Sequence, residues 1–375
     1  GLRGLPNIMG GIETHSQNLY ERLATLEPSL RIVVLGRSPY LAKKHDVWNG
    51  VTVDGVWTVK NKYLETILHT FLAVIRARWV EKAEIIHIHA IGPGLLAPLA
   101  RLLGMKVVVT HHGHDYERMK WGLLPRLALR LGEALMMLTA HQVIAVGKSS
   151  AQRLRNRFPS HAKNVHYIPN GATIPEMGSA SHTTLEELGL EPREYILTVG
   201  RFVPEKGFQD LIAAHAKTRT NLKLVIVGGS DHDDKFSKSL RDAASEGVIL
   251  AGIRRGQELA TLFRNAALFV LPSYHEGLPI AALEALHADV PVLLSNIEPN
   301  RDIGLPSMNY FPVGDVTNLS ERLSTERFDN LRVNAALRLL EYDWDEIARN
   351  TLSLISQLSE APLAAEQPRP DQAHA

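Results

Sequence analysis

The sequence predicts an α/β protein with two doubly wound, Rossmann-like domains that face each other across a cleft. Short apolar runs rich in β-branched residues alternate with longer amphipathic stretches along nearly the whole chain, a pattern typical of βαβ units with parallel strands. The pattern occurs twice, and a segment rich in Pro, Gly, Ser and Thr separates the two series. A chain of 375 residues has room for two such domains, each with its own core.

The first domain is predicted over residues 1–172. It opens with the glycine-rich stretch "GLRGLPNIMGG", which normally follows a first strand. No strand precedes it, so we expect either a sheet that lacks this strand or a chain that begins late. Strands are predicted at 30–37, 84–90, 105–111 and 141–148, and helices at 64–79, 94–103 and 123–139. Residues 168–184 break every periodicity and are expected to link the domains.

The second domain is predicted over residues 193–342. Its strands are expected at 195–201, 222–229, 247–252, 267–273 and 290–296, with helices between them. One more amphipathic helix, predicted at 344–358, is a candidate to pack back on the first domain. The Pro-, Ala- and Gln-rich tail from about residue 361 is expected to be disordered. Two domains of this kind bind ligands between the carboxyl ends of their sheets.

The composition excludes several classes of protein. Hydrophobic residues make up 45% and charged residues 22% of the chain, as in a globular enzyme. The chain has no cysteine, which excludes disulfides, thiolate metal sites and cysteine nucleophiles. We find no apolar run of membrane-spanning length and no secretory signal, and we expect a cytoplasmic protein. A net charge of +1 gives no reason to expect a nucleic-acid partner.

Two loops of the second domain are candidate anion sites. In "VGRFVPEKGFQDL", Arg201 and Lys206 lie between a strand and a helix that begins near Phe208. Two cations and a helix N-terminus at one sheet edge suit a phosphate or diphosphate. In "SYHEGLPIAALEAL", Pro279 suits the first helical position. The amides of Gly277 and Leu278 would then form a second anion site.

Glu276 and Glu284 flank the start of this second helix. Eight helical residues span about 12 Å, whereas the two carboxyl groups of a glycosidase lie roughly 5 to 9.5 Å apart. The spacing therefore favours two carboxylates that hold different parts of one elongated ligand. In the first domain, Gly10 and Gly11 precede a helix that begins near Ile12, and glycines there allow the backbone to approach a ligand closely.

These stretches resemble the retaining glycosyltransferases of family four, which have the GT-B fold. The resemblance covers almost the whole chain and depends most on "GRFVPEKG" and on the two glutamates of "EGLPIAALE", supported by "PNG" at 169–171 and by Gly10-Gly11. It implies that Arg201 and Lys206 neutralise the leaving nucleoside diphosphate, that Glu276 contacts the donor sugar and that Glu284 binds the ribose. It also places Ile253 beside the base.

The resemblance further implies a metal-independent enzyme without a cofactor, whose donor is a nucleotide sugar. The stretches "GLPNIMGGIETH" and "HHGHDYERMKWG" look most like bacterial enzymes of surface-polysaccharide synthesis, including rhamnosyl- and other hexosyltransferases. The expected acceptor is therefore a glycan or lipid-linked glycan. The family often has "EGFGLP" where this chain has "EGLP", which leaves open which sugar hydroxyls are recognised.

The histidines of "THHGHDY" raise a different interpretation, a metal site. His111, His112 and His114 end one predicted strand beside Asp115, and His87 and His89 share one face of another strand. Imidazole and carboxylate are suitable zinc or iron ligands, so a metal-dependent hydrolase is one alternative, and a non-catalytic nucleotide-sugar-binding protein is a second. No ordered metal-ligand spacing is present, and histidines also bind sugar hydroxyls and phosphate. We therefore predict no metal.

By the resemblance, His112 lies beside the anomeric carbon of the donor. His111 is expected to point into the sheet, His114 and Asp115 to shape the acceptor side, and His87 and His89 to be buried.

Residues 101–163 carry eleven Lys and Arg against three Asp and Glu, a local net charge of +8. The pairs Arg126/Arg130 and Arg153/Arg157 each lie four apart on a predicted helix and so share a face. An anionic membrane surface is therefore a further expected partner. The leucines on the same helix as Arg126, such as Leu127, Leu131 and Leu135, are expected in the core.

Overall fold

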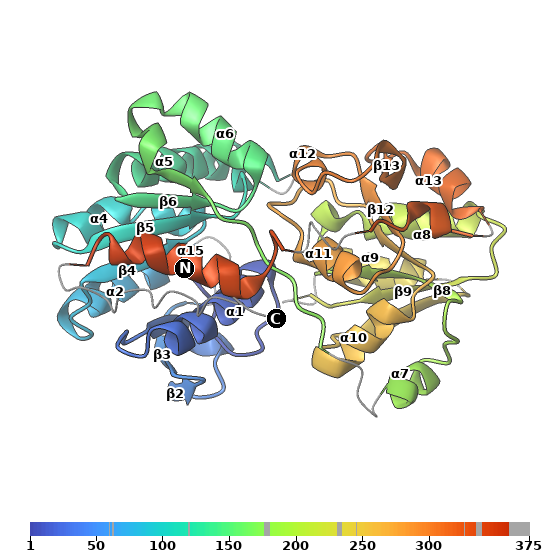
Figure 1. Cartoon of the computed structure of the whole chain (residues 1–375), viewed down its shortest axis with the longest axis horizontal. Coiled ribbons are helices and arrows are strands. Elements are labelled where there is room, and N and C mark those ends of the chain that lie inside the picture. Colours follow the sequence, from blue (N-terminus) through green and yellow to red (C-terminus); the bar gives the residue numbers. More distant parts are fainter. Residues whose placement is uncertain are drawn as a thin grey trace, which may run out of the picture.

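The computed structural model describes residues 1–59, 61, 64–118, 121–175, 181–230, 235–244, 246–325, 327–334 and 340–359, except for the side chains of residues 181 and 182. Two α/β domains lie side by side (Figure 1), each built around parallel strands with helices on the outside. The predicted fold class is confirmed. The tail predicted to be disordered lies outside the described residues.

The first domain contains two sheets. A parallel sheet has the order β4-β5-β6-β7, and a smaller sheet has the order β1-β3-β2 with β2 antiparallel to β3. Its strands are β1 (Val33–Arg37), β2 (His45–Trp48), β3 (Val51–Val56), β4 (Ile85–His89), β5 (Lys106–His111), β6 (Gln142–Ala145) and β7 (Val165–Tyr167). Its helices are α1 (Gly11–Leu26), α2 (Glu65–Trp79), α3 (Ile91–Gly94), α4 (Ala97–Leu102), α5 (Leu123–Thr139) and α6 (Lys148–Arg157).

Several short elements of this domain differ from the prediction. Sequence patterns missed β2, β3 and β7. Strand β7 has only three residues, and no face of β2 is buried. The helix predicted at 94–103 corresponds to the shorter α4, and a separate short helix, α3, precedes it. Pro98 lies in the first turn of α4, where its missing N–H costs nothing and its ring favours a new helix start.

The segment before α1 runs between the two sheets. The Arg37 amide of β1 donates to the carbonyl oxygen of Arg3 over 2.9 Å. On the other side, a Cβ on Gly1 would lie 2.9 Å from the carbonyl oxygen of His89 in β4. Residues 1–10 form no strand, and they bring Gly10 and Gly11 to the edge of the domain where β4 ends.

The second domain has one six-stranded parallel sheet with the order β10-β9-β8-β11-β12-β13. Its strands are β8 (Tyr195–Val199), β9 (Lys223–Val227), β10 (Val248–Gly252), β11 (Leu268–Leu271), β12 (Val292–Ser295) and β13 (Tyr310–Phe311). Its helices are α7 (Ser181–Glu187), α8 (Phe208–Lys217), α9 (Lys235–Ala243), α10 (Gly256–Arg264), α11 (Ile280–His287), α12 (Glu298–Arg301) and α13 (Val316–Leu323). The strand order reverses between β8 and β11, and doubly wound sheets bind ligands at such a point.

The chain returns to the first domain at its C-terminal end. Helix α15 (Trp344–Ser356) lies across the first domain in Figure 1. Its buried residues Trp344, Ile347 and Ala348 share a core with Leu19 and Leu23 of α1. The predicted linker is shorter than expected, because α7 already begins at residue 181; residues 176–180 lie outside the described part of the chain.

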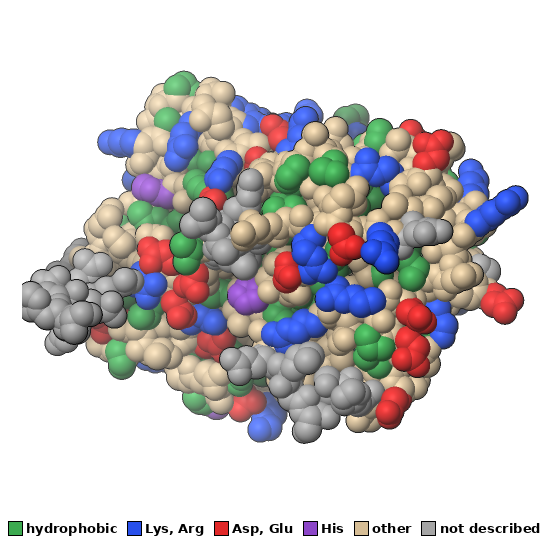
Figure 2. Space-filling model, turned by 45° about the vertical axis from the view of Figure 1, so that its right-hand side comes forward, with side chains coloured by type: hydrophobic (Ala, Val, Ile, Leu, Met, Phe, Trp, Pro, Cys, Tyr) green, Lys and Arg blue, Asp and Glu red, His purple; other side chains and the backbone are tan. Residues whose placement is uncertain are grey.

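The surface carries mixed charge. On the face that Figure 2 shows, basic and acidic side chains lie beside one another over most of the area, in keeping with the net charge of +1. None of the described helices combines the length and the apolar character needed to cross a membrane.

Candidate active site

The loop after β8 carries the two predicted cations. Arg201 and Lys206 are both half-buried there, and α8 begins at Phe208. The loop is held close to its neighbour, since a Cβ on Gly228 would overlap the carbonyl oxygen of Gly200. Gly207 has a φ of 68° and packs against the backbone of Pro272, so the turn into α8 requires glycine. The cations therefore lie on a tightly packed loop where the strand order reverses.

Lys206 meets Glu276, the first of the two predicted glutamates. Lys206 Nζ donates to Glu276 Oε1 over 2.6 Å, and Ser273 Oγ donates to the same oxygen over 2.6 Å. Burial raises the pKa of Glu276, but the Lys206 charge and the two hydrogen bonds outweigh burial and hold the pKa below its usual range. Glu276 is therefore a carboxylate at neutral pH.

Glu284 lies in α11 in a different environment. Pro279 was predicted as the first residue of this helix. It is the N-cap residue instead, and the helix begins at Ile280. The Glu284 side chain is half-buried, and burial raises its pKa to about 8. Glu284 is therefore largely protonated at neutral pH, unlike Glu276.

The histidine loop of the first domain touches the glutamate loop of the second. A Cβ on Gly277 would lie 2.0 Å from the carbonyl oxygen of His112, and a Cβ on Gly113 would lie 3.2 Å from the carbonyl oxygen of Glu276. Only glycines allow two backbones to approach this closely. The loops that follow β5 and β11 thus meet, and the backbones of His112 and Glu276 lie close together.

A second contact joins the domains beside the first. Asn170 Nδ2 donates to the carbonyl oxygen of Leu278 over 2.7 Å, and Asn170 Oδ1 lies 2.9 Å from His15 Nδ1. Neither His15 nor Asn170 was among the predicted site residues. They lie in α1 and in the segment after β7, and no spacing along the sequence indicates that they meet.

Among the described residues, five histidines form two groups. His15, His89 and His112 form one, in which His89 Nδ1 lies 3.0 Å from His112 Nε2. Burial lowers the pKa of His15 to about 4 and holds the pKa values of His89 and His112 well below the usual range, helped by the neighbouring histidines. These rings are therefore neutral at pH 7. His87 lies behind them, with Nε2 2.7 Å from Thr110 Oγ1.

The second group surrounds Glu133 of α5. His111 Nε2 and His114 Nδ1 lie 3.3 and 3.0 Å from Glu133 Oε1, and Arg157 of α6 pairs with Oε2. His111 is fully buried, as predicted. His114, expected to shape the acceptor side, is instead buried against Glu133. The prediction missed Glu133, since one glutamate in an apolar helix has no distinctive spacing.

The remaining predicted residues lie after the end of β10 and at the start of α1. Ile253 follows β10, is 45% exposed and lies beside Gly229 of the loop after β9. Gly11 is exposed and has open space where a Cβ would lie. Gly10 has a φ of 149°, and a Cβ there would overlap the carboxylate of Glu13. A ligand can therefore approach the backbone at Gly11.

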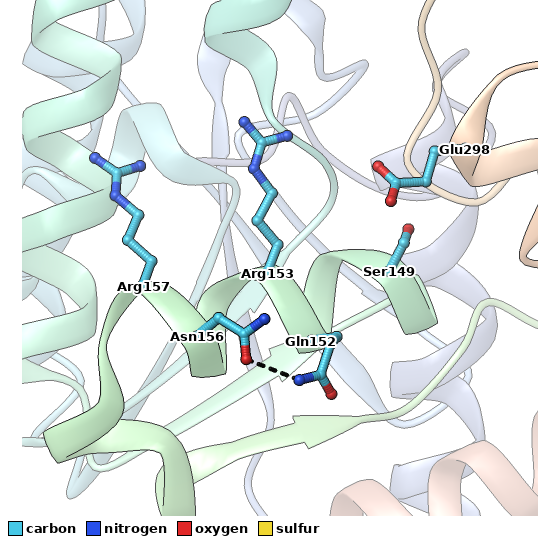
Figure 3. Close-up of a pocket in the computed structure, with 6 residues that line it drawn as sticks. All are labelled: Ser149, Gln152, Arg153, Asn156, Arg157 and Glu298. Atoms are coloured by element: carbon cyan, nitrogen blue, oxygen red, sulfur yellow. Dashed lines mark hydrogen bonds between the residues drawn. The ribbon is translucent and has the colours of Figure 1, made fainter.

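One open hollow lies outside this region. It measures about 540 Å³ and is bounded by α6 and α12 (Figure 3). Arg153 and Arg157 extend from the same side of α6, and Gln152 donates to Asn156 over 2.8 Å. None of its six lining residues is a predicted site residue. The hollow is therefore separate from the predicted site residues.

Comparison with known proteins decides the family. The model of the family described as "Glycosyltransferase Family 4" matches residues 9–174, and the model of the family described as "Glycosyl transferases group 1" matches residues 183–324. The chain is a family four glycosyltransferase with the GT-B fold. The enzyme is thus a hexosyltransferase, and the metal-dependent hydrolase considered above is not favoured.

Relatives and solved structures agree with this assignment. An uncharacterized glycosyltransferase, MJ1607, of Methanocaldococcus jannaschii is 27% identical over 93% of this chain and 95% of that protein. A UDP-Gal:alpha-D-GlcNAc-diphosphoundecaprenol alpha-1,3-galactosyltransferase of Escherichia coli is 29% identical over 59% of this chain and 59% of that protein. The structure of sucrose-phosphate synthase from Thermosynechococcus elongatus superposes with a TM-score of 0.80 at 20% identity, covering 96% of this chain and 97% of that one. The structure of Anabaena HepE in complex with UDP and glucose superposes with a TM-score of 0.73 at 17% identity, covering 95% of this chain and 98% of that one.

Proposed function

We propose that this glycosyltransferase transfers a sugar from a nucleoside-diphosphate donor to an acceptor hydroxyl with retention of configuration and without a metal ion. The observation that carries the proposal is the Lys206–Glu276 pair, which lies at the reversal of strand order and faces the His112 loop. A cation for the diphosphate and a carboxylate for the sugar thus meet where the two domains touch.

In this proposal, Arg201 and Lys206 stabilise the negative charge that grows on the leaving diphosphate as the glycosidic bond lengthens. A preorganised donor aimed at developing charge typically contributes about 3 to 4 kcal/mol. Glu284 binds the ribose, Ile253 lies beside the base, and the amides of Gly277 and Leu278, with the backbone at Gly10 and Gly11, complete the donor site. These cations remove the need for a metal at the diphosphate.

The state of Glu276 makes it a poor general base for the acceptor hydroxyl. Its carboxylate is held by Lys206 and Ser273, and its lowered pKa makes it a weak base. The leaving phosphate instead accepts the acceptor's proton on the same face of an oxocarbenium-like sugar. His112 lies beside the anomeric carbon, where a neutral imidazole can bind a sugar hydroxyl.

Donor choice and stereochemistry are tested together. Solved structures of the same fold were obtained with UDP and with UDP-glucose, so UDP-sugars come first in a panel that also contains ADP- and GDP-sugars. Proton NMR of the first product reports the anomeric configuration, with Lys206→Ala as the inactive control. An inverted product would overturn retention. Donor binding with neither transfer nor hydrolysis across an acceptor panel would indicate a non-catalytic binding protein.

Metal independence has its own test. After exhaustive EDTA treatment and desalting, we expect unchanged turnover. Loss of activity that Mg²⁺ or Mn²⁺ restores would overturn this part of the proposal.

We also propose that the acceptor is a glycan or lipid-linked glycan of a bacterial surface polysaccharide or glycolipid, and that the enzyme attaches to anionic membrane surfaces through α5. Two relatives are named for transfer to diphospho-undecaprenol-linked sugars. The expectation that the α5 leucines are core is wrong for Leu127 and Leu131, which are 62% and 53% exposed. Leu123 and Leu124 are exposed at the start of the helix, beside exposed Arg126 and Arg130.

An apolar face with arginines suits the boundary between lipid headgroups and acyl chains. Each basic residue near an anionic surface contributes about 1 kcal/mol, and salt screens this attraction. We expect co-sedimentation with phosphatidylglycerol vesicles at low salt, less at high salt, and little with phosphatidylcholine vesicles. The double variant Leu123→Ser/Leu127→Ser should lose binding, whereas Leu102→Ser, at an exposed leucine of α4, should retain it. Equal recovery in all conditions, or none, would overturn the membrane proposal and leave the transferase unaffected.

A further inference from the structure

Three histidines from three separate segments meet beside the contact between the two domains. His15 comes from α1, His89 ends β4 and His112 follows β5. One ring nitrogen from each lies within 4.8 Å of the other two, and the nearest pair, His89 Nδ1 and His112 Nε2, is 3.0 Å apart. Nitrogen ligands of one zinc ion lie about 2.0 to 2.1 Å from the metal, so small side-chain movements would bring all three into one coordination sphere.

The hydrogen bonds of His15 determine which nitrogen carries its proton. Asn170 Nδ2 donates to the carbonyl oxygen of Leu278, which leaves Asn170 Oδ1 as an acceptor toward His15 Nδ1. His15 Nδ1 is therefore the protonated nitrogen, and Nε2 carries the lone pair. Nε2 is buried and has no hydrogen-bond partner in the described part of the chain. A metal-binding histidine shows this same arrangement, with one nitrogen donating to an oxygen and the other free for the metal.

His89 can present its lone pair to the same point. Its Nε2 lies 2.6 Å from Tyr20 Oη, which lies 3.2 Å from His87 Nδ1, and His87 Nε2 lies 2.7 Å from Thr110 Oγ1. When His89 Nε2 donates to Tyr20, Tyr20 donates to His87, and His87 donates to Thr110. Every member is then satisfied, and His89 Nδ1 is an acceptor. His112 is partly exposed, so an ion could reach the group from solvent.

The charges in the other histidine group already neutralise each other. His111, His114, Tyr116 and Arg157 all contact the single buried carboxylate of Glu133. The arginine supplies the positive charge that a metal would otherwise provide. Each group has a buried ring nitrogen without a hydrogen-bond partner among the described residues, His15 Nε2 in the first and His114 Nε2 in the second. The group of His15, His89 and His112, however, contains no carboxylate and no cation.

We infer that His15, His89 and His112 form a binding site for Zn²⁺ or a similar imidazole-seeking divalent ion. Three neutral imidazoles with one open position are a common ligand set for zinc. A consequence follows that rests on the proposed function: an ion held by His112 occupies the place of the donor sugar, so zinc inhibits transfer. The site is thus inhibitory and is not required for catalysis.

Binding is measured first, by calorimetry with zinc chloride on the full chain after chelation and desalting. We expect saturable binding of one ion per chain. His15→Asn and His89→Asn should each lose it. Asn170→Ala removes the partner of His15, together with the hydrogen bond to the Leu278 carbonyl oxygen, and should weaken binding about 10- to 100-fold. His45→Asn, which removes a surface histidine beside Asp54, should bind zinc like the wild type. His114→Asn tests the second group and should also retain binding.

A measurement on the unmodified protein avoids dependence on variants that fold poorly. Long-range ¹H–¹⁵N correlation spectra of the histidine rings should show zinc-induced shifts for three histidines, with His15 shifted at Nε2. The inference is overturned if the wild type shows no saturable binding, if His15→Asn binds equally well, or if only His114→Asn loses binding. Zinc should also lower transfer, and EDTA should restore it. If no donor supports transfer, the proposed function fails while the binding result still decides the site.

Discussion

The contact between the two domains has two walls, one from each domain, and the walls differ in charge. The wall of the second domain carries ions: Lys206 and Glu276 pair over 2.6 Å, and Arg201 lies on the same loop. The wall of the first domain has neutral rings, because burial holds the pKa values of His15, His89 and His112 far below neutrality. The walls touch at His112 and Gly277.

This difference matches the two parts of a nucleotide-sugar donor. The diphosphate needs fixed positive charge as the glycosidic bond breaks, whereas the sugar needs hydrogen-bond partners of either kind. In the proposed function, a cation on the histidine wall would lie beside the sugar and not beside the diphosphate. If the division is correct, substitutions on the charged wall should affect the rate most, and substitutions where the walls meet should affect alignment.

The largest effect is expected for the cations. Lys206→Ala or Arg201→Ala should lower kcat about a hundredfold or more, because one lost stabiliser of a developing anion costs about 3 to 4 kcal/mol. Steady-state kinetics measures the change. Arg349→Ala, which removes a surface cation paired with Glu346 on α15, should leave kcat unchanged. A fall of less than about fivefold in both cation variants would place them outside the site.

The contact between the walls is tested by Gly277→Ala. The added Cβ would lie 2.0 Å from the carbonyl oxygen of His112, so the domains could not approach as they do here. We expect kcat to fall roughly tenfold to a hundredfold, since misplacement by about 1 Å has effects of that size. Binding of the nucleoside diphosphate should persist. Gly122→Ala is the control, because that glycine has a negative φ and open space around it. Unchanged turnover in Gly277→Ala would show that the contact is not part of the working state.

The two glutamates should separate in a binding experiment. Glu284→Ala should weaken binding of the nucleoside diphosphate roughly tenfold to a hundredfold, the loss of about 1.5 to 3 kcal/mol for hydrogen bonds to a charged group. Glu276→Ala should leave this binding unchanged or tighter, because Lys206 is released toward the phosphate, while sugar transfer is lost. Calorimetry distinguishes the two variants. An equal loss of affinity in both would contradict the separate roles.

Sequence patterns predicted the charged wall better than the neutral one. Arg201, Lys206, Glu276 and Glu284 lie in two short stretches at strand ends, and strand ends of a parallel sheet meet at one edge, so local spacing was enough. The group of His15, His89 and His112 is drawn from segments far apart in the chain. Its members meet only because α1, β4 and β5 pack together, which periodicity along one segment cannot show.

For α5, local spacing predicted the wrong buried face. Its leucines recur at helical spacing, which predicts a buried face, yet Leu127 and Leu131 are exposed. The helix buries Gly132, Glu133, Met136 and Met137 instead. Spacing alone could not distinguish the two faces, because α5 is apolar on both and its buried glutamate is satisfied only by residues of other segments.

The smallest effect expected is a pH dependence that arises from Glu284. Its pKa is raised to about 8 in the unliganded enzyme, and a carboxylate accepts hydrogen bonds from ribose hydroxyls more strongly than a carboxylic acid does. Binding should therefore favour the ionised form and tighten as the pH rises through 8. Between pH 7.5 and pH 9 the ionised fraction of such a group increases about fourfold, so the affinity should rise by up to about fourfold. A terminal phosphate, with a second pKa near 6, is already ionised in this range.

Glu284→Gln should bind more weakly at pH 9 and show no rise between the two pH values, and calorimetry with the bare nucleoside diphosphate measures both. The same group predicts a stability change of known sign. A raised pKa in the folded state favours folding below the unfolded value of about 4.5, and this contribution is lost as the pH rises to about 8. The wild type should therefore lose stability relative to Glu284→Gln between pH 5 and pH 8 in denaturant titrations. A wild-type affinity that stays flat from pH 7.5 to pH 9 would show that Glu284 does not bind the nucleotide as a carboxylate.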